Sequence, residues 1–354
     1  MTSAPTTTTE SRLPGLEVEG VEPQTKPNHW LERGPQKRLM VFSGRSHPDL
    51  AARMADHLGV ELGEIELETF ANGETYCRYG ESIRGTDVFI VQTGCEPVDR
   101  NLMELAFMIQ AAKLASAKRI TAVIPLFPYA RQDRKAKPRE PISARYVADM
   151  LQLAGADRVL TMDLHAGQIQ GFFTIPVDHM TALTLFARHF RDMGLTGENV
   201  VSVSPDAGRA KMAVRFGEMI DGEFAIMHKT RPAHDVAEVT EITGRVKGKT
   251  AIVGDDAIMT GSTLLANVQA LRDHGAAEVW VFATHGVFCA GALERFAKAD
   301  LAGIVVTDTV PIDPLQRPPR MTVLPVAGLL AETIMNVFAD DSVSAIFGGE
   351  NQLF

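Results

Sequence analysis

Short apolar segments rich in β-branched residues alternate along most of the chain with longer segments of helical periodicity. The first pair is a strand predicted at 39–42 and a helix predicted at 48–57. Further strands are expected at 87–91, 119–124 and 158–162, and further helices at 101–114 and 142–153. Because the strand segments are apolar throughout, they predict parallel sheets that are covered by helices on both faces.

The same alternation begins again after residue 180. Strands are expected at 200–203, 224–227, 250–253, 279–284 and 304–307, and helices at 181–193, 207–219, 263–274 and 291–298. Two successive sets of strands and helices predict an α/β protein with two domains of similar build, 37–180 and 181–339. Ligands of such sheets bind beyond the carboxyl ends of the strands, so candidate site residues are expected there.

Residues 1–36 have no apolar periodicity. They contain a threonine run at 6–9 with scattered prolines and glutamates, a composition typical of a disordered tail. An artefactual start of the sequence is the alternative interpretation. In both cases we expect no chemistry from this segment.

Composition and charge narrow the class of protein. The 354 residues are 45% hydrophobic, but no apolar stretch reaches the length of a membrane-spanning helix, and the N-terminus lacks the pattern of a secretory signal. Three widely spaced cysteines, Cys77, Cys95 and Cys289, predict a cytoplasmic protein without a zinc site. The net charge of −9 argues against non-specific binding of nucleic acid, so an anion site needs positive charge that is concentrated locally.

The most informative segment follows the strand predicted at 250–253. Asp255 and Asp256 accept hydrogen bonds, which suits the vicinal hydroxyl groups of a sugar. The next turn places hydroxyl groups and free backbone N–H groups at a helix N-terminus, which suits a phosphate; it consists of Thr260, Gly261, Ser262 and Thr263. Together these features predict a sugar-phosphate site. A plain Ser/Thr helix cap after an aspartate turn is the alternative.

A second candidate site follows the strand predicted at 158–162. Asp163 and His165 are two residues apart, so in an extended chain they share one face and point together into the crevice. A third polar residue, Asp206, also follows a strand and opens a helix. Oxygen ligands with one imidazole suit magnesium that is bound partly through water and phosphate. A structural Asp–His hydrogen bond is the alternative.

Positive charge is concentrated in two places. The first is a loop with five cations at 131–139, which provides the field that ATP would need, with Arg131 nearest to the strand end. The second is Lys229 with Arg231, which share a face after the strand predicted at 224–227 and can neutralise a transferring phosphoryl group. Solvated surface cations are the alternative in both places.

Several sequence segments, taken together, resemble the ribose-phosphate diphosphokinase (5-phosphoribosyl 1-diphosphate synthetase) family. The matching segments, in order, are FSGRSHP at 42–48, FANGE at 70–74, FPYARQD at 127–133, DLHAGQIQGFF at 163–173, SPDAG at 204–208, THG at 284–286 and SVSAIF at 342–347. The resemblance covers nearly all of 38–347, and this many segments in the right order make it highly specific.

The resemblance implies roles for the candidate residues. ATP contacts are implied for Phe70, Asn72, Gly73 and Glu74 on one loop and for Arg131 and Gln132 on another. Magnesium ligands are implied at His165, Asp206 and Asp163, and a catalytic pair at Lys229 and Arg231. The implied ribose 5-phosphate site comprises Arg231, Asp255, Asp256, Met259, Thr260, Gly261, Ser262 and Thr263.

The resemblance also implies the architecture and the reaction. Family members have two tandem phosphoribosyltransferase-like domains, here an ATP-binding domain at 37–180, joined by the C-terminal segment 340–354, and a ribose 5-phosphate-binding domain at 181–339. The C1 hydroxyl of ribose 5-phosphate attacks the β-phosphorus of ATP, and AMP leaves. A cytoplasmic homohexamer with ADP or phosphate as allosteric ligand, and without nucleic acid or membrane partners, is expected.

The sequence departs from the family pattern at several positions. The family loop usually reads Asp-Asp-x-x-Asp-Thr-Gly/Ala-Gly-Thr, whereas Met259 stands in place of the third aspartate and Ser262 in place of the following glycine. Gly254 and Ala257 stand in place of larger residues. Two further departures are Thr174, where many members have aspartate, and Cys289-Ala290-Gly291, where Ser-x-Pro is usual.

Three functions are compatible with these features. The first is an active diphosphokinase, which Lys229 and Arg231 favour. The second is a weakly active or non-catalytic regulatory paralogue that binds nucleotide and assembles with an active subunit, which Met259 favours. The third is a nucleobase phosphoribosyltransferase, an interpretation weakened by the adenine loop and the tandem domains, which such enzymes do not need.

Overall fold

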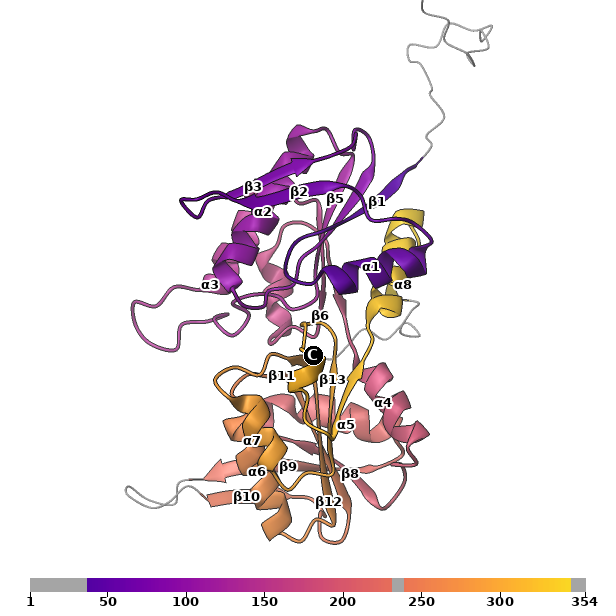
Figure 1. Ribbon diagram of the computed structural model, residues 1–354. Helices are drawn as coiled ribbons and strands as arrows, with labels where there is room; N and C mark the ends of the chain where they lie inside the picture. Colours follow the sequence, from indigo (N-terminus) through magenta and orange to yellow (C-terminus); the bar gives the residue numbers. More distant parts are fainter. Residues whose placement is uncertain (1–36, 231–238, 345–354) are drawn as a thin grey trace, which may run out of the picture. The chain divides into compact units, whose positions relative to one another are not determined.

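The computed structural model describes residues 37–230 and 239–344, which contain two large, mainly parallel sheets. The first sheet has the strand order β1-β4-β5-β6-β7, and all of its pairs are parallel. Its strands are β1 (Leu39–Ser43), β4 (Asp87–Val91), β5 (Arg119–Ile124), β6 (Arg158–Met162) and β7 (Val177–Met180). The helices of this part are α1 (Pro48–Leu58), α2 (Val98–Leu114) and α3 (Ser143–Ala154) (Figure 1).

The second sheet has the order β10-β9-β8-β11-β12-β13-β14, in which only β9 and β10 pair antiparallel among the described strands. Its strands are β8 (Val200–Ser204), β9 (Glu223–Thr230), β10 (Val239–Thr243), β11 (Thr250–Ile258), β12 (Glu278–Gly286), β13 (Gly303–Thr307) and β14 (Met321–Leu324). Its helices are α4 (Leu183–Asp192), α5 (Ala210–Met219), α6 (Ser262–Asp273) and α7 (Ala292–Lys298). The predicted α/β class with mainly parallel sheets is confirmed.

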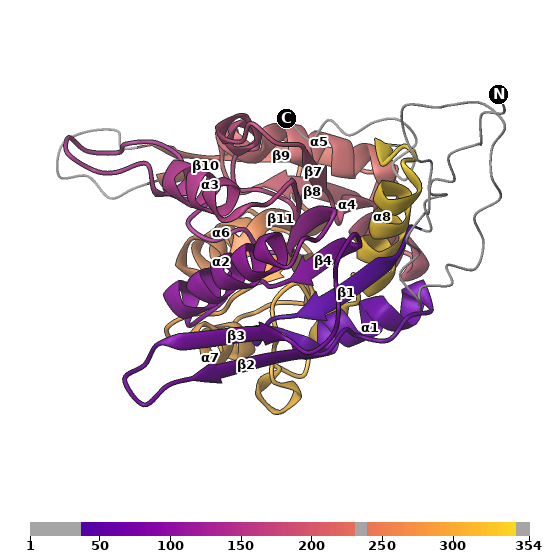
Figure 2. The same ribbon diagram turned by 90° about the horizontal axis from the view of Figure 1, so that it is seen from above.

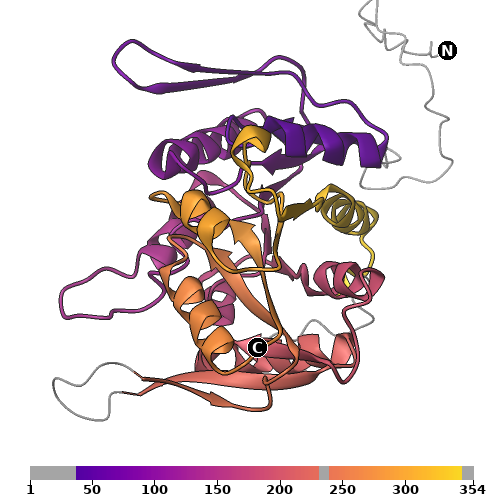
Figure 3. The ribbon, with the colours of Figure 1, turned by 60° about the horizontal axis from the view of Figure 1, so that its bottom comes forward.

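Several elements were absent from the prediction. A separate antiparallel hairpin, β2 (Ile65–Thr69) with β3 (Thr75–Tyr79), stands out from the first sheet in Figure 3. Its residues are only half-buried, so they lack the continuous apolar run by which the sheet strands were found. Strands β7 and β14 were missed because neither is a fully buried apolar run: β7 contains Asp178 and His179, and three of the four residues of β14 are only partly buried.

The last helix, α8 (Ala327–Ala339), lies against α1, as Figures 1 and 2 show from two directions. The predicted domain boundary at 339 assigns α8 to the second domain. In the structure, α8 contacts α1, a helix of the first sheet's part. Asp340, just after α8, then pairs with Lys37 and with Arg119, 2.6 Å away. The rest of the segment 340–354 lies mostly outside the described residues.

Three hydrophobic cores stabilise the fold. One lies between the first sheet and helices α2 and α3, and another lies between the second sheet and helices α6 and α7. The third is continuous across both sheets and includes residues of α1, α4, α5 and α8. Because this shared core joins the two sheets, side chains from both can meet in one site. Among the described helices, none combines the length and the apolar character needed to cross a bilayer.

The shared core explains why a glycine stands in the central strand β11. Gly254 pairs in register with Phe282 of β12, and a Cβ atom at Gly254 would lie 2.3 Å from the Phe282 ring. The ring is fully buried against Phe216 and Phe186, with centroids 4.5 and 4.7 Å away. Phe282 therefore fills the space that an apolar side chain at 254 would otherwise occupy.

We predict that Gly254→Val destabilises the protein by about 1–3 kcal/mol, because the added side chain overpacks the core. Combining it with Phe282→Leu should recover much of this loss, because the smaller side chain leaves room. Urea unfolding of the two variants measures the difference. A double variant no more stable than Gly254→Val would contradict this account of the pair.

Polar contacts also connect the two sheets. His47, before α1, places its Nε2 2.9 Å from the carbonyl oxygen of Asp308, after β13. Arg53 of α1 forms an ion pair of 2.9 Å with the Asp308 carboxylate. His285 of β12 is fully buried, and its Nε2 lies 3.1 Å from the carbonyl oxygen of Met162. Burial lowers the pKa of His285, although the charge of Asp163 partly opposes this shift.

We predict that acid weakens the fold through His285. Below its ordinary pKa of 6.5 the unfolded chain binds a proton that the buried ring does not. The free energy of unfolding therefore decreases as pH falls, by about 1.4 kcal/mol per pH unit for one such group. The variant His285→Asn keeps a donor and an acceptor but does not titrate, so its stability should depend less on pH. Exposed His57, replaced by asparagine, is the control; an unchanged slope in His285→Asn would contradict the prediction.

Candidate active site

Two adjoining cavities lie where the carboxyl ends of the two sheets meet. The larger, of about 520 Å³, is lined from the first sheet by the loop at 126–132 and by residues after β6. The smaller, of about 210 Å³, is lined by the loop at 258–264 and by Asp206. The two cavities share five lining residues: Arg131, His165, Asp256, Ala257 and Met259. The structure thus brings three of the four predicted sites together.

The smaller cavity has the features expected for a phosphate at a helix N-terminus. Helix α6 begins at Ser262, directly after Gly261, whose φ of 71° favours glycine. A Cβ atom at Gly261 would also lie 2.2 Å from the ring of Phe296, which is buried. The first N–H groups of α6 have no partner within the helix and are available to an anion.

Three departures from the family pattern, Ala257, Met259 and Ser262, lie in the walls of these cavities. Met259 is partly buried and lines both cavities, so it stands at the border between them. Ser262 is exposed, and its hydroxyl lies 3.4 Å from that of Thr260. Met259 and Ser262 are therefore placed to contact a bound ligand.

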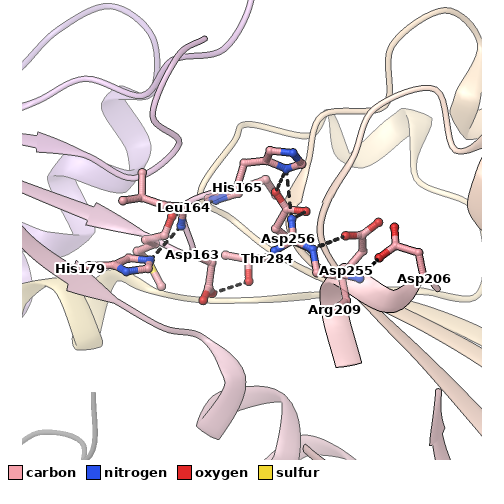
Figure 4. Close-up of polar contacts among 12 residues, drawn as sticks. Asp163, Leu164, His165, His179, Asp206, Arg209, Asp255, Asp256 and Thr284 are labelled. Carbon is pink, nitrogen blue, oxygen red and sulfur yellow. Dashed lines mark hydrogen bonds and ion pairs between the residues drawn. The ribbon is translucent and has the colours of Figure 1, made fainter. Parts of the chain in front are cut away.

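Asp255 and Asp256 lie within β11, which extends beyond the strand predicted at 250–253. The strand stays paired with β12 as far as Ile258, and Asp255 pairs in register with Ala283. The carboxylate of Asp256 contacts two side chains. Its Oδ1 accepts a hydrogen bond from Nη2 of Arg209, and its Oδ2 lies 2.9 Å from Nδ1 of His165 (Figure 4).

The two neighbouring acids have opposite pKa shifts. Burial and the adjacent charge of Asp256 raise the pKa of Asp255 well above its ordinary value. Burial alone would also raise the pKa of Asp256, but the contact with His165 and the charge of Arg209 outweigh it and lower this pKa. Of the two acids, Asp256 is therefore the one whose ionised form the site favours more strongly.

The extended chain predicted for Asp163 and His165 is not observed, because the strand ends at Met162 and Asp163 has a φ of 32°, but both residues line the larger cavity. The alternation of an extended chain therefore does not apply. Oδ2 of Asp163 accepts hydrogen bonds from the Thr284 hydroxyl, 2.6 Å away, and from the Ala182 N–H, 2.8 Å away. The carboxylate of Asp163 faces Thr284 in Figure 4, whereas the His165 ring faces Asp256.

His165 and Asp206 do line the same cavity. Asp206 is exposed, and its Oδ1 accepts a hydrogen bond of 2.8 Å from the N–H of Gly208. Within the described residues, no group of three histidine, cysteine or acidic side chains could hold a metal ion. A carboxylate and an imidazole at the wall suit magnesium that retains water and phosphate ligands, so these residues fit an ion that arrives with a nucleotide.

The predicted ATP contacts separate into two groups. Arg131 and Gln132 line the larger cavity, and Oε1 of Gln132 accepts a hydrogen bond of 2.6 Å from Ser143. The other four, Phe70, Asn72, Gly73 and Glu74, form the tip of the β2–β3 hairpin and line neither cavity. Phe70 is 49% exposed, and its ring centroid lies 5.6 Å from that of Tyr76. The structure does not bring this tip to Arg131.

The predicted catalytic pair lies at the edge of the described chain. Lys229 is in β9, where it pairs in register with Thr240 of β10. Arg231 lies outside the described residues. The role of both residues therefore stays a prediction from the sequence.

Sequence reasoning missed Arg209, which contacts both acids of β11 and His165. Its sequence signal was weak: it follows the segment SPDAG directly, in a short 3₁₀ turn at Ala207–Arg209. No periodicity indicates that this side chain reaches a neighbouring strand. Thr284 was part of a recognised segment, but its hydrogen bond to Asp163 needed the three-dimensional arrangement.

Two mainly parallel sheets of this kind, with an acid pair at the end of a central strand and a glycine turn before the next helix, define an α/β protein of phosphoribosyltransferase-like fold. Known families agree with this class. The N-terminal domain of ribose phosphate pyrophosphokinase matches residues 39–155, and the phosphoribosyl synthetase-associated domain matches residues 227–348. The chain belongs to the ribose-phosphate pyrophosphokinase family.

Individual relatives match over nearly their whole length. The ribose-phosphate pyrophosphokinase of Caldanaerobacter subterraneus is 49% identical over 87% of this chain and 98% of its own. The enzyme of the same name from Mycobacterium leprae is 47% identical over 89% of this chain and 97% of its own. The crystal structure of phosphoribosylpyrophosphate synthetase from Mycobacterium smegmatis is 46% identical, with a TM-score of 0.80 over 86% of this chain and all of that one.

The opposite pKa shifts predict unequal effects of two similar substitutions. Asp256→Asn leaves the charge of Arg209 without its partner in a nearly buried position, so we expect a loss of about 3 kcal/mol in the free energy of unfolding. Asp255 has the raised pKa and the longer contact to Arg209, at 3.4 Å, so the effect of Asp255→Asn should be within about 1 kcal/mol. Urea unfolding near neutral pH measures both. Equal losses would show that the two acids do not differ in ionisation.

Proposed function

We propose that the chain transfers the diphosphoryl group of ATP to the C1 hydroxyl of ribose 5-phosphate. The products are 5-phosphoribosyl 1-diphosphate, which serves nucleotide biosynthesis, and AMP. The observation that carries this proposal is the junction of the two cavities. One is lined by the predicted ATP contacts Arg131 and Gln132, the other by the predicted sugar-phosphate loop, and His165 lies in the wall of both. Family membership supports it.

The size and lining of the cavities favour one placement of the substrates. The larger cavity, with Arg131 at its wall, suits the triphosphate and sugar of a nucleotide. The smaller cavity suits ribose 5-phosphate, with its phosphate at the N-terminus of α6 and its hydroxyl groups toward Asp255. The β-phosphorus of ATP then lies near the junction, where Met259 borders both cavities.

The proposed reaction needs no protein nucleophile. The C1 oxygen forms a bond to the β-phosphorus, the bond from that phosphorus to the oxygen bridging to the α-phosphate breaks, and the hydroxyl proton is released. Such transfers depend on positioning and on neutralising the charge of the phosphoryl oxygens. We assign that neutralising charge to Lys229 and Arg231, on the basis of their sequence match.

We further propose that magnesium is held by His165 and Asp206, with Asp163 as the less suited third candidate because its Oδ2 already accepts two hydrogen bonds. When bound, the ion would neutralise phosphate charge. Asp206 sits at an exposed position at the start of a turn, where its carboxylate can reach a hydrated ion.

An assembly of identical chains is part of the proposal. Helix α2 exposes Met103, Phe107 and Leu114, and helix α3, which contacts α2, exposes Tyr146 and Leu153. Leu114 and Leu153 are 76% and 86% exposed, unusual values for leucine. We infer that another copy of the chain covers this surface, as the expected hexamer would require. A monomer in light scattering would contradict this inference. Regulation by ADP or phosphate remains a prediction from the family resemblance.

A cytoplasmic location is also proposed. The three cysteines, Cys77, Cys95 and Cys289, are all free in the structure. Unpaired cysteines are typical of reducing compartments. Fractionation of the native cells measures the location, and recovery of the protein outside the cytoplasm would contradict it.

Release of AMP from ATP, measured with and without ribose 5-phosphate, tests the proposed reaction. We expect AMP only when the sugar phosphate is present. In Lys229→Ala and Arg231→Ala, kcat and kcat/KM should fall together by about a hundredfold or more, because the lost charge acts mainly in the transition state. A higher KM for ATP with unchanged kcat would contradict the catalytic assignment. ATP binding without any AMP release would instead favour a regulatory paralogue.

A further inference from the structure

Arg209 lies where three predicted ligand contacts converge. Its Nη2 donates to Oδ1 of Asp256 and lies 3.1 Å from Nδ1 of His165. Its Nε lies 3.4 Å from Oδ1 of Asp255. The three partners come from two different sheets, and Figure 4 shows the guanidinium beside both acids. Only 14% of the Arg209 side chain is exposed, so the group is part of the wall of the site.

The acid pair needs a cation at this place. Asp255 and Asp256 are consecutive residues of one strand, and their side chains are only 24% and 10% exposed. Two carboxylates this close repel each other, and removal from water makes each negative charge costly. A guanidinium that contacts both offsets this cost, and its planar fork suits carboxylate oxygens better than an ammonium does.

The contacts leave little of the pair for another cation. Both oxygens of Asp256 have partners, since Oδ1 accepts from Arg209 and Oδ2 lies at His165. Oδ1 of Asp255 accepts the N–H of Asp256 at 2.9 Å and also faces Arg209. Although these two acids converge with His165, the described residues contain no metal-binding group of three such side chains. The guanidinium lies between these two acids and His165, in contact with all three.

We propose that Arg209 is the resident cation of the acceptor side of the site and takes the place that a divalent ion would otherwise occupy between Asp255, Asp256 and His165. The sugar phosphate then binds at a site whose positive charge, the guanidinium of Arg209, is always present. A divalent ion enters only with the nucleotide, toward Asp206. The role of Arg209 in the reaction rests on the proposed function. The position of its charge between the three side chains does not, and it can be tested without substrates.

The local fold fixes Arg209 in this position. It ends the 3₁₀ turn Ala207–Arg209, which begins with Asp206 as its cap, and it precedes helix α5 directly. One short segment thus presents a carboxylate to the smaller cavity and a cation to the acids behind it. Arg209 also borders a third cavity, of about 300 Å³, so its side chain separates two spaces.

Binding of Mn²⁺ to the protein without nucleotide tests the proposal directly. Electron paramagnetic resonance of free Mn²⁺ measures how much ion the full chain removes from solution. We expect no specific Mn²⁺ site in the wild type and one new site in Arg209→Ala. The Kd of this site for Mn²⁺ should be lower than that of any binding to the wild type by about tenfold or more, which is about 1.4 kcal/mol. Arg209→Lys keeps a cation and should resemble the wild type. A specific nucleotide-independent site in the wild type would overturn the proposal whether or not the variants fold.

Two controls locate the effect. Arg188→Ala removes an exposed arginine of α4 and should leave Mn²⁺ binding unchanged. Adding Asp255→Asn to Arg209→Ala should abolish the new site, because it removes one of the three donors. If folded Arg209→Ala, checked by circular dichroism, binds no Mn²⁺, then Arg209 does not occupy a cation position and the proposal fails.

Kinetics separates this inference from the proposed function. At saturating ATP and ribose 5-phosphate, the wild-type rate should not rise when magnesium exceeds ATP, whereas the rate of Arg209→Ala should rise. A wild type that needs free magnesium beyond ATP would overturn the role of Arg209 but leave the reaction intact. Absence of AMP release from every form would refute the reaction, while the Mn²⁺ measurement would still decide the cation position.

Discussion

The site depends on the hydrophobic core that continues beneath both sheets. Phe89 and Met162 contribute to it from the first sheet, and Ile252 and Phe282 from the second. Each large apolar side chain buried there stabilises the fold by about 1.5–3 kcal/mol, so burial in this core holds the two sheets together. This core places the ends of β6, β11 and β12 against one another.

The polar residues of the site follow from that placement. Asp163 of the first sheet meets Thr284 of the second, and His165 meets Asp256. His285 is buried between the sheets and contacts the carbonyl oxygen of Met162. These are direct contacts between residues of the first sheet and residues of the second. Breaking the buried ones is costly, because it leaves polar groups without partners inside the protein. Substrate binding is therefore expected to move loops and side chains, not the sheets.

Strands and helices with a regular apolar pattern could be predicted from the sequence. Features that depend on contacts between distant elements could not. Continuous apolar strands such as 87–91 and 158–162 were placed to the residue, because burial on both faces leaves a strong pattern. The carboxyl-end rule brought His165, Asp206 and the loop at 258–264 into one cavity. The extent of β11 was underestimated, since Asp255 and Asp256 interrupt its apolar pattern although pairing with β12 continues.

Other features of the site have no local signal. The contacts of Arg209 depend on the distance between a turn and a neighbouring strand, which no residue pattern records. The extended chain expected at Asp163 and His165 is absent because Asp163 has a positive φ. In this conformation the Asp163 carboxylate accepts a hydrogen bond from the Ala182 N–H. The hairpin tip was assigned to the nucleotide by resemblance, and its position away from both cavities is a tertiary property.

Arg209 gives an electrostatic explanation for one departure from the family loop, Met259. A divalent ion needs several carboxylates around it, and a third aspartate in the loop would add one. A single guanidinium already balances one carboxylate of the pair, so a third would leave the cavity with excess negative charge beside a phosphate. Met259, at the border of the two cavities, adds no charge there. A protein cation and an uncharged residue at 259 are therefore consistent parts of one acceptor site, in which Arg209 supplies positive charge and residue 259 adds no carboxylate to those of Asp206, Asp255 and Asp256.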